Sequence, residues 1–273
     1  MAIVVVERRY MIVTLLFALT CHFSNLTHCF RPKKLNVSAV TTSDSDWSIA
    51  AATFYGEPNG YGSDAGACGY RTAVAQPPFS SMVSAGGASL FKSGIGCGAC
   101  YQVKCTSNSE CSKDPVTVVI TDACLDCYRE SVHFDLSDTA FGAMAISGQG
   151  SQLRNAGVLE ILYKKVECNF AGETVTFRVD EGSNDHYFAA LVAYGDGEIG
   201  QVELKQALVS DTWLSMSHLW GAVWKLQVSS PLRAPLSLRV TSLQSGQTVV
   251  ATDAIPAGWP RGANYKSNVN FQV

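Results

Sequence analysis

The cysteines most constrain what this chain can fold into. Ten are present, and two of them, Cys21 and Cys29, lie in an N-terminal segment of different character from the rest. The other eight lie between Cys68 and Cys168, and the chain beyond Cys168 has none. An even set of cysteines in an oxidising compartment favours disulfides. The sequence therefore predicts a disulfide-rich first unit followed by a cysteine-free second unit.

Two CxxC pairs leave an alternative open. Cys97 and Cys100 form the first pair, Cys124 and Cys127 form the second, and 23 residues lie between the pairs. Four thiolates in two such pairs are also typical of a structural zinc site. Secretion disfavours zinc, because extracellular cysteines are usually oxidised. We expect no metal and no other cofactor.

The first 29 residues have the pattern of a secretory signal. A charged stretch at 7–9 precedes the apolar run 11–19, and small and polar residues follow, which indicates cleavage at a position within 24–29. A membrane anchor is the alternative, but a spanning helix needs about 20 apolar residues, and polar residues interrupt this run well before that length. The chain is therefore expected to be secreted.

The charge balance indicates a neutral or weakly charged partner. Charged residues make up 16% of the 273 residues and the net charge is -3, so nothing indicates a nucleic-acid surface or a polybasic membrane surface. Residues 30–46 are polar and lack periodicity, which predicts a flexible N-terminal extension. Within it, Asn36 begins an N-glycosylation acceptor sequence.

Between residues 47 and 168 the pattern is that of a β-barrel. Short apolar runs alternate with turns, and only 137–147 has a helical pattern. The glycine-rich stretch 56–69 is expected to be a loop at the rim of a site. Ordered structure is expected to begin at 47–55, and the apolar runs are 88–91, 101–105, 116–121 and 158–166.

Beyond Cys168 the pattern changes to strict alternation. Apolar and polar residues alternate over 174–179 and 236–241, and Ser245-Gly246 then turns the chain into 247–252. Period-two strands separated by turns and without cysteine predict a β-sandwich. The boundary between the two units is expected near 169–173.

Acidic side chains and a histidine gather in the segment from Thr121 to Ser137. Asp122 and Asp135 are predicted to face one groove, and two carboxylates at one groove are the minimum for acid/base work on a glycosidic bond. A structural interpretation is also open. In it, Asp122 caps a turn, Asp135 starts a helix over 136–142, and His133 is a half-buried histidine whose ring is satisfied.

In order along the chain, six short motifs resemble those of a plant expansin of the β class. They are TFYG at 53–56, GACGY at 66–70, GCGACY at 96–101, TD at 121–122, HFD at 133–135 and WGAVW at 220–224. Each motif alone is weak, but the ordered set is specific, and the resemblance covers residues 47–273.

The resemblance implies an all-β fold with two domains. It implies a six-stranded double-psi β-barrel, shared with family 45 glycoside hydrolases, over 47–172, and an immunoglobulin-like carbohydrate-binding sandwich over 173–273. It also implies the disulfides Cys68 with Cys97, Cys100 with Cys168 and Cys105 with Cys111. Cys124 and Cys127 remain, and we expect them to pair with each other.

The resemblance also implies a set of polysaccharide-binding residues. In the groove they are Thr53, Phe54, Tyr55, Asp122, His133 and Asp135, and on the sandwich they are Tyr187 and Trp220. Asp135 corresponds to the general acid of the related hydrolases, but the catalytic base of those enzymes is missing at the TFYG segment. Glu57 lies one residue beyond that segment, where an extended chain points the side chain the other way.

The aromatic residues depart from the family pattern or lie outside it at several positions. Phe54 stands where the family usually has Trp, which makes one stacking platform smaller. Trp213, Trp224 and Tyr194 are expected in the core of the sandwich, because single aromatics on its strands are usually core residues. Trp259 lies in a Pro- and Gly-rich loop, and the sequence predicts no role for it.

Together these observations predict a secreted, monomeric, extracellular protein of the plant cell wall, which meets a membrane only peripherally through the wall. It is expected to bind cellulose and matrix polysaccharides such as xylans, and to loosen noncovalent contacts between wall polymers without net hydrolysis. The first alternative is an inverting endoglucanase-like hydrolase or a transglycosylase with Asp135 as acid and Asp122 or Glu57 as base. A structural or signalling wall protein is the second.

Overall fold

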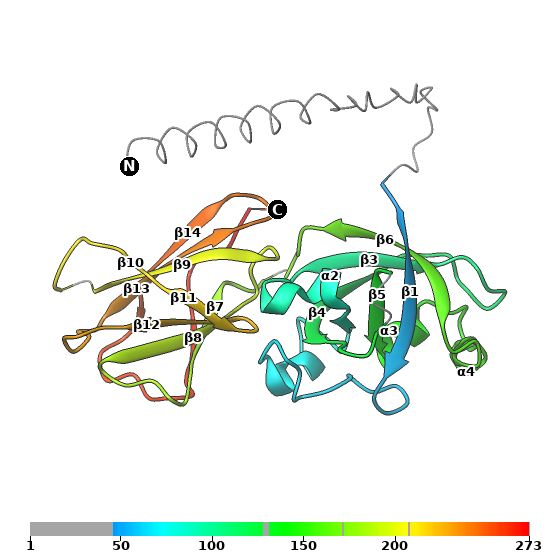
Figure 1. Cartoon of the computed structure of the whole chain (residues 1–273), viewed down its shortest axis with the longest axis horizontal. Helices are drawn as coiled ribbons and strands as arrows, with labels where there is room; N and C mark the ends of the chain where they lie inside the picture. The colour runs from blue at the N-terminus through cyan, green and yellow to red at the C-terminus, as the bar shows by residue number, and fades with distance from the viewer. Residues whose placement is uncertain (1–45, 128–130, 171, 207, 273) are drawn as a thin grey trace, which may run out of the picture. The chain divides into compact units, whose positions relative to one another are not determined.

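A computed structural model describes residues 46–127, 131–170, 172–206 and 208–272. The predicted signal at 1–29, most of the extension at 30–46 and the acceptor Asn36 lie outside these residues. The described residues belong to one compact unit and are all-β, with a closed barrel followed by two further sheets (Figure 1). Within these residues no helix has the length and apolar character needed to cross a membrane.

Six strands close the barrel in the order β1-β5-β2-β4-β3-β6. β1 pairs with β5 and β2 pairs with β4 in parallel, and the other neighbours are antiparallel. The strands are β1 (Ser48–Tyr55), β2 (Val83–Gly86), β3 (Cys100–Cys105), β4 (Val116–Ala123), β5 (His133–Ser137) and β6 (Leu159–Val166).

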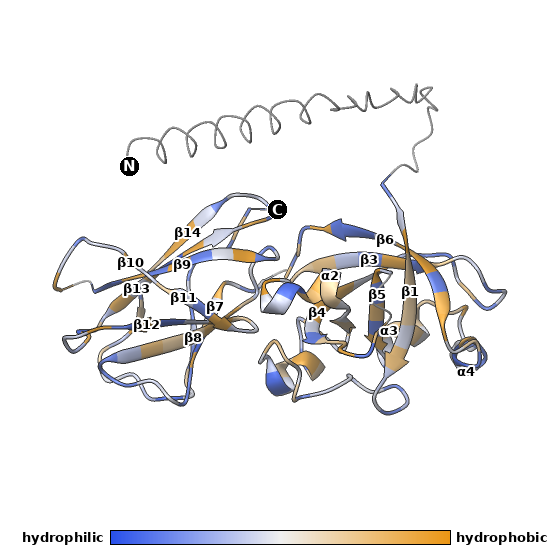
Figure 2. Ribbon diagram, in the orientation of Figure 1, coloured by the Kyte–Doolittle hydropathy of each residue, from blue (hydrophilic) through white to orange (hydrophobic). Residues whose placement is uncertain are grey.

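Side-chain alternation decides what fills the barrel. On β1, Ala50 and Ala52 point into the core while Ile49 and Thr53 point outward, because successive residues of a strand face opposite sides. Figure 2 shows apolar residues along the strands of the barrel and of the sheets that follow. The interior is closed by buried apolar side chains, among them Val103, Val118, Ile120, Phe134, Leu136 and Ile161.

Short helices connect the barrel strands, and one of them corrects a prediction. Ala88–Phe91, predicted as one of the short apolar runs of a β-rich unit, forms the helix α2, because Gly87 is its N-cap and the Gly87 carbonyl accepts hydrogen bonds from Leu90 and Phe91. The other short helices are η1 (Arg71–Ala75), η2 (Lys92–Gly94), α3 (Asp138–Ala143) and α4 (Gly150–Arg154).

The helix predicted over 137–147 exists but is shorter. Ser137 is the N-cap of α3, and its hydroxyl accepts a hydrogen bond from the Ala140 N–H. His133–Ser137 forms strand β5, so Asp135 does not start a helix.

All eight cysteines of the barrel form disulfides, and their pairing is the expected one. The bonds join Cys68 with Cys97, Cys100 with Cys168, Cys105 with Cys111 and Cys124 with Cys127. The two CxxC pairs therefore supply disulfides, and their sulfurs are not thiolate ligands for zinc.

The second half forms two packed sheets, in the orders β10-β9-β13-β14 and β11-β12-β8-β7-β15. Alternate residues, such as Phe177, Phe188 and Leu238, meet between the sheets, which is the predicted sandwich. The strands are β7 (Thr176–Val179), β8 (Tyr187–Ala193), β9 (Ile199–Gln206), β10 (Leu214–Ser215), β11 (Ser217–Trp220), β12 (Val223–Gln227), β13 (Leu236–Ser242), β14 (Thr248–Ile255) and β15 (Asn264–Lys266).

Candidate functional site

Strand register places the predicted groove residues in one row across the barrel. Thr53 on β1 is paired with Asp135 on β5, Asp135 is paired with Ala85 on β2, and Ala85 is paired with Asp122 on β4. Directly paired residues share one face of a sheet, so Thr53, Asp135 and Asp122 lie on the same outward face. The small side chain of Ala85 separates the two carboxylates.

The Thr53 hydroxyl joins Asp135 to His133. It donates to Asp135 Oδ1 at 2.6 Å, and His133 Nε2 lies 2.9 Å from the same oxygen atom of Thr53. Because this hydroxyl proton points at the carboxylate, its oxygen accepts from the histidine, which places a proton on Nε2. The result is a chain of donors from His133 through Thr53 to Asp135.

Burial governs the protonation of both ends of this chain. It raises the pKa of Asp135 above its usual value, the charge of Asp122 adds to the rise, and the Thr53 hydrogen bond and the charge of His133 oppose it. Burial also lowers the pKa of His133, against the charge of Asp135. These shifts favour a neutral His133 and make Asp135 a stronger proton acceptor than an exposed aspartate.

Asp122 also has the structural role that the sequence left open. Its Oδ1 accepts hydrogen bonds from the N–H groups of Ala67 and Ala123, both at 2.7 Å. A Cβ on Gly66 would come within 2.7 Å of the Thr121 carbonyl oxygen, so this close approach of the loop requires glycine. Asp122 therefore stands in the row and fixes the loop that contains Gly66.

Tyr55 shares the outward face of the row, two residues along β1 from Thr53, whereas Phe54 does not. Burial raises the pKa of the Tyr55 hydroxyl, and the charges of Asp122 and Asp135 raise it further. The Phe54 ring lies 4.9 Å from that of Phe141 and packs against the barrel core. Neighbouring residues of β1 face opposite sides, so Phe54 does not share the outward face of Thr53 and Tyr55.

On the sandwich, Trp220 and Tyr187 lie on one outer sheet face. Trp220 is paired with Val223, which is paired with Leu191, and Tyr187 lies four residues before Leu191 on β8. Trp220 is 43% exposed. A Cβ on Gly69 would come within 2.8 Å of its ring, so the loop fixed by Asp122 also contacts Trp220.

The three aromatic residues predicted in the core of the sandwich have three different surroundings. Trp224 is buried in the sandwich core, as predicted, and Tyr194 packs against the apolar cluster shared with the barrel. Trp213 was expected in the core and is not part of it. It lies beside the cations of Lys205 and Arg239, because the strand β10 that follows it is an edge strand.

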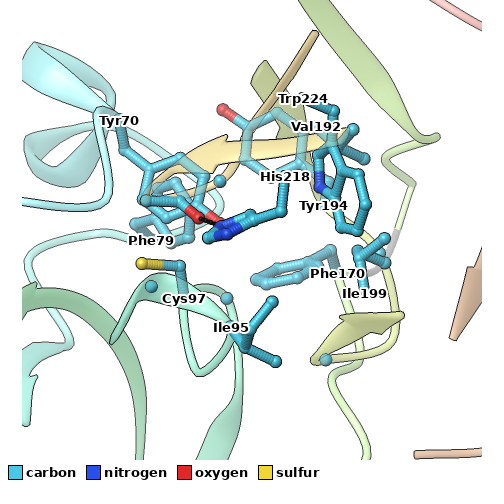
Figure 3. A pocket seen from close by; sticks show the side chains of 16 residues that line it. Tyr70, Phe79, Ile95, Cys97, Phe170, Val192, Tyr194, Ile199, His218 and Trp224 are labelled. Atoms are coloured by element: carbon cyan, nitrogen blue, oxygen red, sulfur yellow. Dashed lines mark hydrogen bonds between the residues drawn. The ribbon is translucent and has the colours of Figure 1, made fainter. Parts of the chain in front are cut away.

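An apolar cavity between barrel and sandwich residues is not a ligand site. Figure 3 shows His218 inside it, between Tyr70 and Trp224. The His218 Nε2 lies 2.8 Å from the Gly221 carbonyl oxygen. The free space is about 20 Å³, which holds about one water molecule.

Comparison with known proteins decides the family. A family model described as the expansin C-terminal domain matches residues 175–256, and one described as lytic transglycolase matches residues 83–163. An Arabidopsis thaliana protein named as an expansin-B2 is 76% identical over 99% of this chain and 100% of its own length. Expansin-B11 of Oryza sativa subsp. japonica is 49% identical over 86% of this chain and 81% of its own length. The chain belongs to the plant β-expansin family.

Solved structures agree with this assignment. The apo expansin of Clavibacter michiganensis is 26% identical, has a TM-score of 0.62, and aligns over 83% of this β-expansin and 99% of its own chain. A mutant of the same bacterial expansin, in complex with cellohexaose, is 25% identical with a TM-score of 0.63 over the same shares.

Sequence reasoning missed one network that positions the groove of this β-expansin. Asp138 is buried, forms an ion pair with Arg154, and accepts a hydrogen bond from the Asn59 N–H. The Asp138 carboxylate thereby connects α3 and α4 to the loop that follows Tyr55. An acidic residue in the first helical turn was the available signal, but its partners are distant along the chain.

Proposed function

We propose that this β-expansin binds wall polysaccharide along the row of Thr53, Asp135 and Asp122 and on the face of Tyr187 and Trp220. In this proposal it loosens noncovalent contacts between wall polymers without net hydrolysis. The observation that carries the proposal is the loop of Gly66 to Gly69, which contacts Asp122 at one end and Trp220 at the other. The cellohexaose complex of the bacterial expansin supports a glucan as ligand.

The chemistry of the two surfaces suits a long polymer. Asp135 and Thr53 offer hydrogen bonds to sugar hydroxyls, and the aromatic rings offer stacking on pyranose faces. Stacking adds only about 0.5 to 1.5 kcal/mol per ring beyond its area burial, so affinity must come from several weak sites in line. We infer that cellulose and matrix polysaccharides such as xylans are the ligands, in preference to short oligosaccharides.

The position of the carboxylates supports binding without hydrolysis. An inverting glycosidase needs a second carboxylate that is free to act as base, whereas Asp122 already accepts two N–H groups with its Oδ1. Glu57 is exposed beyond the end of β1, in a turn closed by a hydrogen bond from the Gly60 N–H to its carbonyl. The proposal therefore gives neither side chain the role of a catalytic base.

The enzymatic alternative has one observation in its favour. Burial raises the pKa of Asp135, as a general acid requires. An endoglucanase or transglycosylase would use this acid with Asp122 or Glu57 as base. The two candidate functions therefore differ in the role of Asp135, which is a hydrogen-bonding group for sugar in one and a general acid in the other.

One experiment separates the candidates. Wall extension under constant load and reducing-sugar release are measured on the same wall sample with the purified protein. We expect extension without sugar release. Release in proportion to extension would establish the hydrolase instead, and the absence of both would favour a structural or signalling protein. Transglycosylation is tested separately, with a labelled oligosaccharide acceptor.

The proposal also covers secretion and the division of the chain into domains. We infer a signal at 1–29, a glycan at Asn36, a barrel domain over 47–172 and a carbohydrate-binding domain over 173–273, in a monomer of the extracellular wall. N-terminal sequencing of protein collected from the culture medium tests the signal. A mature chain that starts outside 25–30 would contradict the cleavage range.

A further inference from the structure

A hollow lies at one end of the sandwich strands, outside the groove and the Tyr187 and Trp220 face. It has a volume of about 470 Å³ and is formed by the turn before β8, the segment after β12 and the loop between β14 and β15. Ligand pockets typically measure about 300 to 1,000 Å³, so the hollow has the size of a small-ligand site. No residue assigned to polysaccharide binding above lines it.

Trp259 forms an aromatic wall of this hollow. Its ring lies 5.6 Å from that of Phe188 in an edge-to-face arrangement, and it packs against the sandwich core. Pro260 follows it in the lining, and buried Leu232 contributes from the segment after β12. The wall is thus held by the core, which gives a ligand a preformed apolar surface.

Polar side chains of three chemical types line the same hollow. Asp185 offers a carboxylate and Arg261 a guanidinium, both exposed, and neither forms an ion pair with any residue that the structure describes. Asn184 uses its Oδ1 to accept from the N–H groups of His186 and Tyr187, at 2.9 and 3.1 Å. Its amide NH₂ group is not used in these bonds, so acceptors and donors stand around one aromatic wall.

We propose that this hollow, the Trp259 pocket, binds a terminal neutral sugar unit. A sugar presents C–H groups to an aromatic ring and hydroxyls that both donate and accept hydrogen bonds, which matches Trp259 beside Asp185, Arg261 and Asn184. One side chain of each charge favours a neutral ligand over a uronic acid. The inference rests on the proposed function, because the ligand is part of the polysaccharide.

The position of the pocket explains why the unit is terminal. Asn184 and Tyr187 close a tight turn through N–H to carbonyl bonds of 2.7 and 3.1 Å, so the pocket lies one turn from the Tyr187 platform. A polymer that lies flat on the platform does not enter a hollow beyond the ends of the strands. A side branch of that polymer, or its chain end, does reach the pocket.

Titration of the full-length mature protein tests the proposal, with the indole N–H signals of its tryptophans followed by NMR. The Trp259 signal is assigned with Trp259→Phe. The probes are cellohexaose, linear xylohexaose and a xylo-oligosaccharide with a single arabinose branch on an internal unit. The test variant is Asp185→Ala with Arg261→Ala, and the control is Arg233→Ala, an exposed arginine nearby that does not line the pocket.

We expect the branched probe to shift the Trp259 signal. The double variant should bind it about tenfold more weakly, which corresponds to about 1.4 kcal/mol for the lost hydrogen bonds, while Arg233→Ala binds it normally. A Trp259 shift with the linear probes as well, lost in the double variant, identifies chain ends as the source. A shift confined to the branched probe identifies side branches.

Two results overturn the proposal. If Trp220 responds to the probes while Trp259 does not, or if the double variant binds every probe like the parent protein, the pocket is not a sugar site and polysaccharide binding stands. If neither tryptophan responds and insoluble polysaccharide is not retained, the proposed function fails together with the pocket.

Discussion

Thr53→Val tests whether the donor chain of the groove contributes to the fold and to the chemistry. Valine keeps the branched shape but removes the hydroxyl, so the His133 Nε2–H loses its acceptor and Asp135 loses a donor at 2.6 Å. His133 is 2% exposed, and removing the acceptor of a buried N–H costs about 1 to 3 kcal/mol. The bond to Asp135 adds about 1 kcal/mol, since this carboxylate is partly exposed and water replaces part of the loss.

The expected result is a loss of about 2 to 4 kcal/mol in the free energy of unfolding, a large share of the 5 to 15 kcal/mol typical of a protein. Urea unfolding at neutral pH with the disulfides intact measures it. A second effect appears in an NMR titration of the Asp135 carboxyl. Because the Thr53 hydrogen bond holds this pKa down, the pKa of Asp135 should rise further in the variant.

Thr53→Ser is the matched control, since it keeps the hydroxyl and should leave the Asp135 titration almost unchanged. The reasoning fails if Thr53→Val is as stable as the parent protein and its Asp135 titrates at the same pH. Lower stability with an unchanged titration would mean that Thr53 serves packing and not the carboxylate.

Three further predictions concern the groove and the platform. Asp135→Asn should abolish wall extension in a constant-load assay while circular dichroism shows an intact fold. Asp122→Asn should be milder because its amide oxygen can still accept the two loop N–H groups, and the opposite order would reverse the assigned roles. Burial lowers the pKa of His133, so its contribution to stability is present above about pH 6.5 and is lost as the pH falls from there towards the lowered value. Urea unfolding from pH 7.5 to 5 should therefore depend less on pH in His133→Gln, and equal slopes would contradict this. Trp220→Ala should weaken retention on insoluble polysaccharide and cost about 1 to 3 kcal/mol, since the residue is 43% exposed, whereas removal of the buried Trp224 should cost about 3 to 5 kcal/mol. Unchanged retention with Trp220→Ala would remove it from the platform.

The sequence predicted an element of the fold where a local residue pattern follows directly from which face of that element is buried. Alternation over 236–241 predicted a strand, and it lies in β13 because one face of that strand meets the sandwich core. The motif at 133–135 was harder, since β5 is buried on both sides of the chain and shows no alternation. Its register against β1 and β2, which creates the row of Thr53 and Asp135, depends on barrel closure and is invisible locally.

The elements that sequence reasoning missed depend on contacts between distant residues. α2 forms because the Gly87 carbonyl accepts hydrogen bonds from Leu90 and Phe91, so a short apolar run becomes a helical turn. Trp213 is a large aromatic residue of the kind that usually lies in a core. It instead precedes an edge strand, and its ring lies beside the cations of Lys205 and Arg239. The side chains around Trp259 come from three separate segments, and no spacing in the sequence relates them.

The disulfides differ in their access to solvent, and this makes the chain unevenly sensitive to reduction. Cys68, Cys97, Cys100, Cys105, Cys111 and Cys168 are buried, whereas Cys124 and Cys127 are partly exposed. A bond that closes so short a loop constrains the unfolded chain least, and access favours attack by an external thiolate. A mild reductant would therefore open this bond first. Reduction would free the thiol of Cys124, which lies two residues after Asp122. A fluorescent or spin label on this thiol could report on the groove while the other three disulfides still hold the barrel.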